Sequence, residues 1–143
     1  MKSQAKSKNI EIKESIDKDL LIYADVEMIK TVIRNLLSNA IKFTGKEGLI
    51  NIKAYRENGY ITAYVEDSGV GMSEKIKNSI FSIGDVKSKE GTEGESGTGF
   101  GLMICKEFIE KHNGKIWLES EEGKGSIFYF SIPDLSRNSA NED

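Results

Sequence analysis

The sequence predicts an α+β fold: a two-layer sandwich in which about three helices cover one face of a mixed, mostly antiparallel sheet. Two observations support this fold class. Segments with the apolar spacing of helices alternate along the chain with shorter strand-like segments, and two pairs of these strands are joined by turns too short for a parallel crossover. A chain of 143 residues is also long enough for one domain with a substantial core.

The chain begins with a polar leader and two short strands. Residues 1–8 are polar and have no periodicity. Ile10 and Ile12 then alternate with polar residues in NIEIKES, which indicates a strand. The compact apolar run DLLIYA at 19–24 is suited to a second strand.

A long helix follows. Asp25 has the N-cap position, and residues 26–44 have apolar side chains at helical spacing until TGKEG ends the pattern. The apolar stripe is centred on Ile29, Ile33, Leu36 and Ala40.

A β-hairpin comes next. The segments LINIKAY and YITAYVED flank the tetrapeptide RENG, and Asn58-Gly59 is a dipeptide that favours a tight hairpin turn. The second strand of this hairpin ends at Asp67.

The second half continues the alternation. Ser73 fits the N-cap of a short helix, and residues 84–97 are polar, glycine-rich and aperiodic, which is typical of a mobile functional loop such as a lid. Gly114 has the usual C-cap position for an amphipathic helix over 100–113. The last predicted segments are strands at 115–120 and 126–132 and a disordered tail at 134–143, so that the domain spans 9–133.

Composition excludes several classes of function. A net charge of −3 provides no basic field, so we expect no nucleic-acid partner. No apolar run approaches the ~18 residues of a membrane span, so we do not expect the domain itself to be membrane-bound. One cysteine and one histidine argue against a disulfide and against a His/Cys metal cluster. The single Cys105 suits a reducing, cytoplasmic compartment and is expected to be a small buried side chain.

The first group of candidate residues lies on the long helix. Asn35, Asn39 and Lys42 fall within an arc of about 60° next to the apolar stripe. A carboxamide oxygen can ligate Mg²⁺, and a lysine can pair with phosphate oxygens. The alternative is that three polar surface residues align by chance, as any amphipathic helix allows.

The second group is DSGVGM. Asp67 ends a strand, where its carboxylate can accept the exocyclic amine of adenine, and Gly69 and Gly71 leave room for a flat base against the backbone. An ordinary Asp-Gly turn is the alternative.

The third group is GTGFGL. Gly97, Gly99 and Gly101 precede or open an apolar helix, where free backbone N–H groups and the helix dipole favour an anion. The spacing differs from the dinucleotide fingerprint GxGxxG, and the Walker pattern GxxxxGK[ST] is absent. The glycines are therefore compatible with either a phosphate cradle or a hinge.

Taken in order, these motifs resemble the catalytic ATP-binding domain of sensor histidine kinases, within the gyrase/Hsp90/histidine-kinase/MutL superfamily. The sequence NLLSNAIKFT is similar to the N box, DSGVGM to the G1 box, IFS to the F box and GTGFGL to the G2 box. The segment NGKIWLESEEGKGSIFYFSIP resembles the closing strands. The resemblance covers roughly 9–133 and implies a Bergerat-type fold, with ATP and Mg²⁺ as cofactors.

The resemblance also implies roles for individual residues. Asn39 would ligate the Mg²⁺ and Asn35 would support metal and phosphate, while Lys42 would reach a phosphate and Phe43 would border the pocket. Asp67 would accept the adenine amine, and Gly69 and Gly71 would shape the base pocket. The nucleotide-binding residues of the G2 box would be Gly97, Thr98, Gly99, Phe100, Gly101 and Leu102. Residues 84–96 would be the ATP lid, in which Lys87 and Lys89 either contact the γ-phosphate or are solvated loop charges.

Asn35 separates two kinds of chemistry within the superfamily. The ATP-hydrolysing members have a glutamate general base at this position, whereas an asparagine amide cannot accept a proton from water at neutral pH. The resemblance therefore implies phosphoryl transfer to a histidine, with the protein positioning groups and neutralising charge.

Two features depart from the family pattern. Phe81 is followed by SIGD rather than by Pro-Phe, which places the usual anchoring of the lid in doubt. The only histidine, His112, lies at a helix end in KHNG, where a structural role is expected. The phosphoacceptor is thus expected on a separate dimerisation domain of the parent kinase, with a response regulator receiver domain as an indirect partner.

Two other functions remain as alternatives. One is a stand-alone ATPase of the same superfamily. The other is a nucleotide-sensing module that transfers no phosphate.

Overall fold

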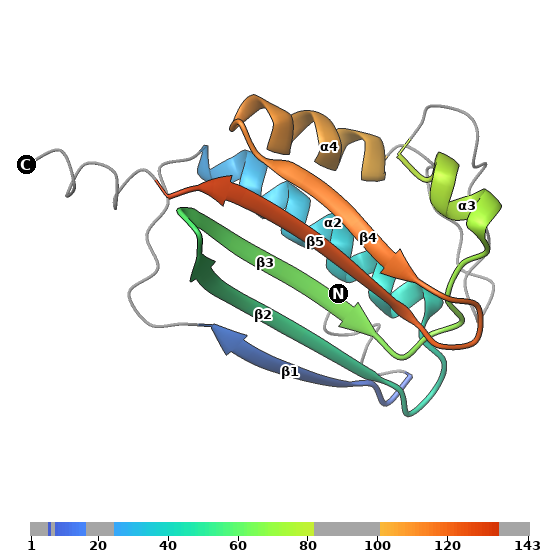
Figure 1. Cartoon of the computed structure of the whole chain (residues 1–143). Helices are drawn as coiled ribbons and strands as arrows, with labels where there is room; N and C mark the ends of the chain where they lie inside the picture. Colours follow the sequence, from blue (N-terminus) through green and yellow to red (C-terminus); the bar gives the residue numbers. More distant parts are fainter. Residues whose placement is uncertain (1–5, 7, 17–24, 82–100, 135–143) are drawn as a thin grey trace, which may run out of the picture.

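Among the residues that the structure describes, a five-stranded mixed sheet carries two helices on one of its faces, and a third, short helix lies near one end of the sheet (Figure 1). This computed structural model describes residues 6, 8–16, 25–81 and 101–134. The strand order is β1-β2-β3-β5-β4, with β1 parallel to β2 and the other pairs antiparallel. The elements are β1 (Glu11–Ile16), α2 (Val26–Phe43), β2 (Leu49–Glu57), β3 (Tyr60–Asp67), α3 (Glu74–Ser79), α4 (Gly101–Lys111), β4 (Lys115–Ser120) and β5 (Ser126–Pro133). The predicted α+β sandwich is confirmed.

Helix α2 is the long helix that the sequence predicts. The Asp25 side chain caps its first turn by accepting a hydrogen bond from the Met28 N–H at 3.1 Å. Val32 and Leu36 on the sheet-facing side are fully buried, whereas Ile33 is 40% exposed. We expected Ile33 at the centre of the apolar stripe. It lies instead at the edge, because the buried arc is shifted toward Val32.

The hairpin turn between β2 and β3 is also as predicted. Asn58 and Gly59 have φ angles of 53° and 81°, and positive φ at both central residues is the requirement of the type I′ turn. The short helix α3 has Ser73 as its N-cap, which accepts from the Ile76 N–H at 3.3 Å.

The end of α4 differs from the prediction. Gly114 was expected as the left-handed cap, but Asn113 has the positive φ of 60°. The N–H groups of Asn113 and Gly114 donate to the carbonyls of Glu110 and Ile109, both at 3.0 Å, which is the Schellman pattern with Asn113 at C′. Gly114 is required for another reason, since a Cβ there would lie 2.1 Å from the Ser131 carbonyl oxygen.

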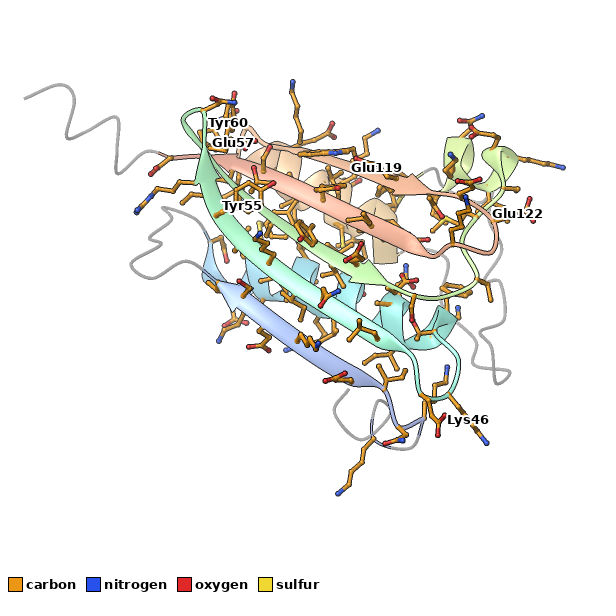
Figure 2. All side chains as sticks on the ribbon, turned by 60° about the horizontal axis from the view of Figure 1, so that its bottom comes forward. Lys46, Tyr55, Glu57, Tyr60, Glu119 and Glu122 are labelled. Carbon is orange, nitrogen blue, oxygen red and sulfur yellow. The ribbon has the colours of Figure 1, made fainter. Side chains whose placement is uncertain are left out.

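The two faces of the sheet differ in character. Aliphatic and phenylalanine side chains of the inner face pack against α2 and α4, with Ile50, Val65 and Phe128 among the most buried. The outer face carries a cross-strand row in which Tyr129 stacks on Trp117 at 5.1 Å between ring centroids. Figure 2 shows Tyr55, Glu57 and Tyr60 at one end of the sheet and Lys46 at the other.

The folded unit extends beyond the limits 9–133. Lys8 and Asp134, which we had assigned to the leader and the tail, are only 4% and 1% exposed. Asp134 pairs with Arg56 at 3.1 Å. The predicted strand at 19–24 and the other residues of the leader and tail lie outside the described residues, apart from exposed Lys6.

Candidate functional site

The C-terminal end of α2 is tied to two other parts of the chain. A helix leaves its last four carbonyls without intrahelical partners, and here each of them has a donor. The donors are Thr44 Oγ1 for Ala40 (2.6 Å), Lys8 Nζ for Ile41 (2.9 Å) and Lys42 (3.1 Å), and the Val70 N–H for Phe43 (3.2 Å). The segment before β1 and the loop after β3 therefore both fix this end, which Figure 1 shows on the same side as the β4–β5 turn.

Asp67 lies in this region as the last residue of β3. It is only 6% exposed. Its carboxylate accepts hydrogen bonds from the backbone N–H of Gly69, at 2.8 Å, and from that of Ser126. Burial raises the pKa of Asp67 from 3.8 to about 6 against the opposing effect of these two bonds. The group is thus a buried acceptor that is mostly ionised at pH 7.

Three glycines let the surrounding backbones touch. A Cβ on Gly69 would lie 2.2 Å from the carbonyl oxygen of the last residue of α2. Gly71 has a φ of +71°, and its Cβ would lie 2.0 Å from the Glu121 carbonyl oxygen in the β4–β5 turn. Gly125 has a φ of +86°, and a Cβ there would lie 2.1 Å from the Asp67 carbonyl oxygen. Close backbone packing alone thus requires Gly69 and Gly71, and their expected contact with a base stays a prediction.

Asn35 faces the first turns of α4. A Cβ on Gly101 would lie 3.0 Å from the Asn35 Oδ1 atom. One turn further along α4, the fully buried Cys105 thiol donates a hydrogen bond to the Val32 carbonyl at 3.8 Å and lies near the Asn35 side chain, which lowers its pKa slightly against the effect of burial. Burial raises the pKa of the Cys105 thiol to about 12, so it is protonated at neutral pH. The expectation of a small buried cysteine is confirmed.

The other predicted residues of α2 are half-buried. Asn39 lies one turn beyond Asn35, and the Lys42 ammonium lies 4.9 Å from the centre of the Phe43 ring. The structure therefore places Lys42 and Phe43 next to the loop that follows Asp67, because the Val70 N–H donates a hydrogen bond to the Phe43 carbonyl.

The G2 box is described only from Gly101 onward. Leu102 is buried in the hydrophobic core, so its side chain contributes to packing. The predicted site residues Gly97, Thr98, Gly99 and Phe100 lie outside the described residues, as does the whole expected lid with Lys87 and Lys89.

The F-box residue Phe81 is anchored in the core. Its ring lies edge-on to Phe128 at 6.3 Å between centroids. The last described residue before the predicted lid is therefore packed against the core.

His112 has the structural role that was expected. Its Nε2 atom accepts a hydrogen bond from the Asp25 N–H at 2.9 Å, so the Nδ1 atom is the donor to the Phe108 carbonyl at 2.7 Å. The imidazole therefore links the end of α4 to the start of α2.

The sequence prediction missed two residues at this site. Lys8 was assigned to a polar leader, and no pattern around it indicates burial. Gly125 was treated only as part of a turn, although the dense glycines of EEGKGS are a signal of close backbone approach.

Comparison with known proteins assigns this fold to a class. A family described as "Histidine kinase-, DNA gyrase B-, and HSP90-like ATPase" matches residues 24–136. The chain belongs to this family, and its relatives identify it as the catalytic ATP-binding domain of a sensor histidine kinase.

Two relatives are adaptive-response sensory kinases named SasA. The protein from Gloeothece citriformis is 38% identical over 135 residues, which are 93% of this chain and 34% of that protein. The one from Prochlorococcus marinus strain MIT 9313 is 36% identical over 133 residues, covering 92% and 36%. The chain thus spans about a third of the length of these relatives.

Solved structures agree with the fold. The nucleotide-free catalytic domain of the histidine kinase ThkA has a TM-score of 0.80 at 36% identity, covering 93% of this chain and 84% of that one. Full-length ShkA in complex with AMPPNP gives 0.75 at 28% identity, covering 92% and 27%. ThkA in complex with the response regulator TrrA gives 0.71 at 32% identity, covering 93% and 36%. None of the helices within the described ranges has the length and apolar character needed to cross a bilayer.

Proposed function

We propose that the chain binds Mg-ATP and donates the γ-phosphate to a histidine on a separate dimerisation and phosphoacceptor domain, in two-component signalling. One observation carries the proposal. The buried carboxylate of Asp67, suited to the exocyclic amine of adenine, lies next to the end of the helix that presents Asn35, Asn39 and Lys42. Membership of the ATPase family supports nucleotide as the ligand.

Transfer to a histidine is favoured over hydrolysis by what surrounds Asn35. Its amide is not a base, and the neighbouring Cys105 thiol stays protonated because its pKa is about 12. Neither group can take a proton from water. A neutral imidazole is itself nucleophilic, so its nitrogen can form the bond to the γ-phosphorus as the bond to the bridging oxygen breaks and ADP leaves.

Mg²⁺ fits this site as an ion held mainly by the substrate. The described residues contain no group of three His, Cys, Asp or Glu side chains that would form a protein cage. Mg²⁺ in nucleotide enzymes usually keeps several waters and takes one or two protein ligands besides phosphate oxygens. The half-buried Asn39 carboxamide would be the protein ligand here, and the ion would neutralise phosphate charge. Lys42 would bind phosphate.

The partners follow from this chemistry. The phosphoacceptor histidine would come from the dimerisation domain of the parent kinase, and a response regulator receiver domain would receive the phosphate afterwards. The complex of ThkA with the response regulator TrrA is a precedent in a related kinase. We place the domain in the cytoplasm, where ATP is available, and expect no nucleic-acid partner.

Radiolabelled ATP tests the proposal directly. The chain is mixed with the separately produced phosphoacceptor domain, and label on that domain is measured with and without Mg²⁺. Asn39→Ala should abolish labelling, whereas Asn78→Ala, at an exposed position on α3, should leave it unchanged. Intact ATP binding without any labelling of the acceptor would refute the kinase function.

The two alternatives predict different results. A stand-alone ATPase would release phosphate steadily without an acceptor, and Asn35→Ala would abolish that release. A nucleotide sensor would bind ADP tightly without Mg²⁺ and transfer nothing, which calorimetry combined with the labelling assay would detect.

A further inference from the structure

Lys8 is a buried cation at the end of α2. The residue is only 4% exposed, and its ammonium donates to three backbone carbonyls: Ile41 at 2.9 Å, Lys42 at 3.1 Å and Thr44 at 3.1 Å. An ammonium has three N–H donors, so these contacts match its full donor capacity. The carbonyls also form the negative end of the helix dipole, where a cation is stabilised.

The chain on either side of Lys8 is bonded to the same region. The Lys8 carbonyl accepts from the Glu47 N–H at 2.8 Å, and the Glu11 N–H donates to the Gly48 carbonyl at 3.1 Å. Residues 8–11 therefore run along the loop between α2 and β2 and are hydrogen-bonded to it. These residues precede the range 24–136 that matches the family.

The contacts continue from Lys8 to the predicted nucleotide residues. Lys42 provides one of the three carbonyls, and the next carbonyl along, that of Phe43, accepts from Val70 at 3.2 Å. Val70 lies in the loop that follows Asp67. Lys8 thus acts on the same helical turn that the adenine-side loop contacts.

We propose that Lys8 is a positioning residue for the nucleotide site: it fixes the last turn of α2, and through it Lys42, Phe43 and the loop after Asp67. The inference rests on the proposed nucleotide binding. It has a regulatory consequence, because any displacement of the segment that enters the domain at Lys8 would change nucleotide affinity, and nucleotide would in turn stabilise the docking of this segment.

Loss of the ammonium should affect this site strongly. A methionine has similar length but no donor, so two buried carbonyls and one partly buried carbonyl would lose a partner and the last turn of α2 would loosen. Lys46 provides the matched control, because it is an exposed lysine on the loop that follows α2 (Figure 2). Lys46→Met removes the same charge from the same end of the domain.

The experiment measures Mg-ATP affinity by calorimetry at a temperature at which every variant is folded. Lys8→Met should weaken binding about tenfold, the equivalent of one lost hydrogen bond to a charged group. Lys8→Arg, which retains the cation and its donors, should stay within about threefold of the wild type, and Lys46→Met should bind as the wild type does. A purely structural role would lower the unfolding midpoint of Lys8→Met and leave its affinity unchanged, which would overturn the inference.

Hydrogen exchange on the wild-type chain gives a second test that needs no variant. Nucleotide should slow exchange of the Glu47 and Glu11 amides, which bond to the Lys8 carbonyl and to the adjacent loop. Unchanged exchange at nucleotide saturation would contradict the coupling even if Lys8→Met failed to fold. A wild-type chain that binds no nucleotide would instead refute the proposed function.

Discussion

Asp67→Asn should make the nucleotide-free domain more stable at neutral pH while it impairs nucleotide binding. The carboxylate is buried, and its ionised form is unfavourable there because the desolvation of the charge outweighs its two backbone hydrogen bonds. Asparagine has nearly the same shape, carries no charge and keeps an oxygen that can accept from the Gly69 N–H.

The magnitude follows from the pKa. The Asp67 carboxyl has a pKa of about 6 in the folded chain against 3.8 as its ordinary value, and at ~1.36 kcal/mol per pKa unit the difference is about 3 kcal/mol. A raised folded pKa means that the native state binds the proton more tightly than the unfolded state. The stabilising effect of that proton is complete below pH 3.8 and is lost as the pH rises through 6. The advantage of Asp67→Asn should therefore be about 3 kcal/mol at pH 8 and about half of that at pH 5.

Urea unfolding of both chains from pH 4 to pH 8 measures this advantage. Glu57→Gln is the control, because it removes a carboxylate that is exposed at the far end of the sheet from Asp67 (Figure 2). A wild-type chain more stable than Asp67→Asn at pH 8, or an advantage that does not diminish in acid, would refute the reasoning. The same variant should bind ATP more weakly, because an amide can present its NH₂ group to the adenine amine as readily as its oxygen.

Three further predictions concern backbone positions. Gly71→Ala should destabilise the domain by about 2–3 kcal/mol, because the new methyl group would clash with the β4–β5 turn and the residue also has a positive φ. Gly59→Ala should cost only about 1 kcal/mol, because the positive φ is the only obstacle there. Urea unfolding of the two variants compares these costs. Asn113→Gly should stabilise the domain by about 0.5 kcal/mol in the same assay, because the residue has the left-handed cap conformation. Gly101→Ala should leave the unfolding free energy unchanged or higher but slow phosphoryl transfer, since the new methyl group would press on Asn35; equal transfer rates in the labelling assay would contradict this.

The fold was predictable because most of its signals are local. The Asp25 cap, the Asn58-Gly59 turn and the alternating strands each specify their own conformation within a few residues, and the structure has all three. Such agreement between local preference and global fold is what a uniquely folding sequence requires.

The prediction of the α4 cap was wrong because tertiary contacts decide the conformation there. Asn113 and Gly114 both suit a helix end, and Gly114 was assigned the cap because glycine is the commoner choice. The crossing backbone at Ser131 leaves no space for a side chain at Gly114. Asn113 therefore has the left-handed conformation, and no sequence pattern shows which strand passes beside the helix end.

The candidate site residues could be identified from the sequence, but the residues that position them could not. Asn39 and Asp67 belong to sequence motifs. Lys8, in contrast, acts because it lies close to α2 in the folded chain, although it is separated from Ile41 by 33 positions in the sequence. A lysine in a polar segment has the same sequence signature whether it is solvated or buried. Only the position of the helix end distinguishes the two cases.

Several residues that depend on tertiary contacts gather at one end of the sheet, and one of them is a locally unfavourable buried charge. A buried carboxylate at Asp67, a buried ammonium at Lys8 and a left-handed backbone at Gly71 and Gly125 all lie around the end of α2. The Lys8 ammonium donates to backbone carbonyls, whereas the Asp67 carboxylate accepts from a backbone N–H group. Folding alone would be served better by a neutral residue at Asp67, because burial disfavours its charged form. Costs of this kind concentrate at functional sites, so the burial of this carboxylate is an argument for a ligand site at this end that is independent of any motif.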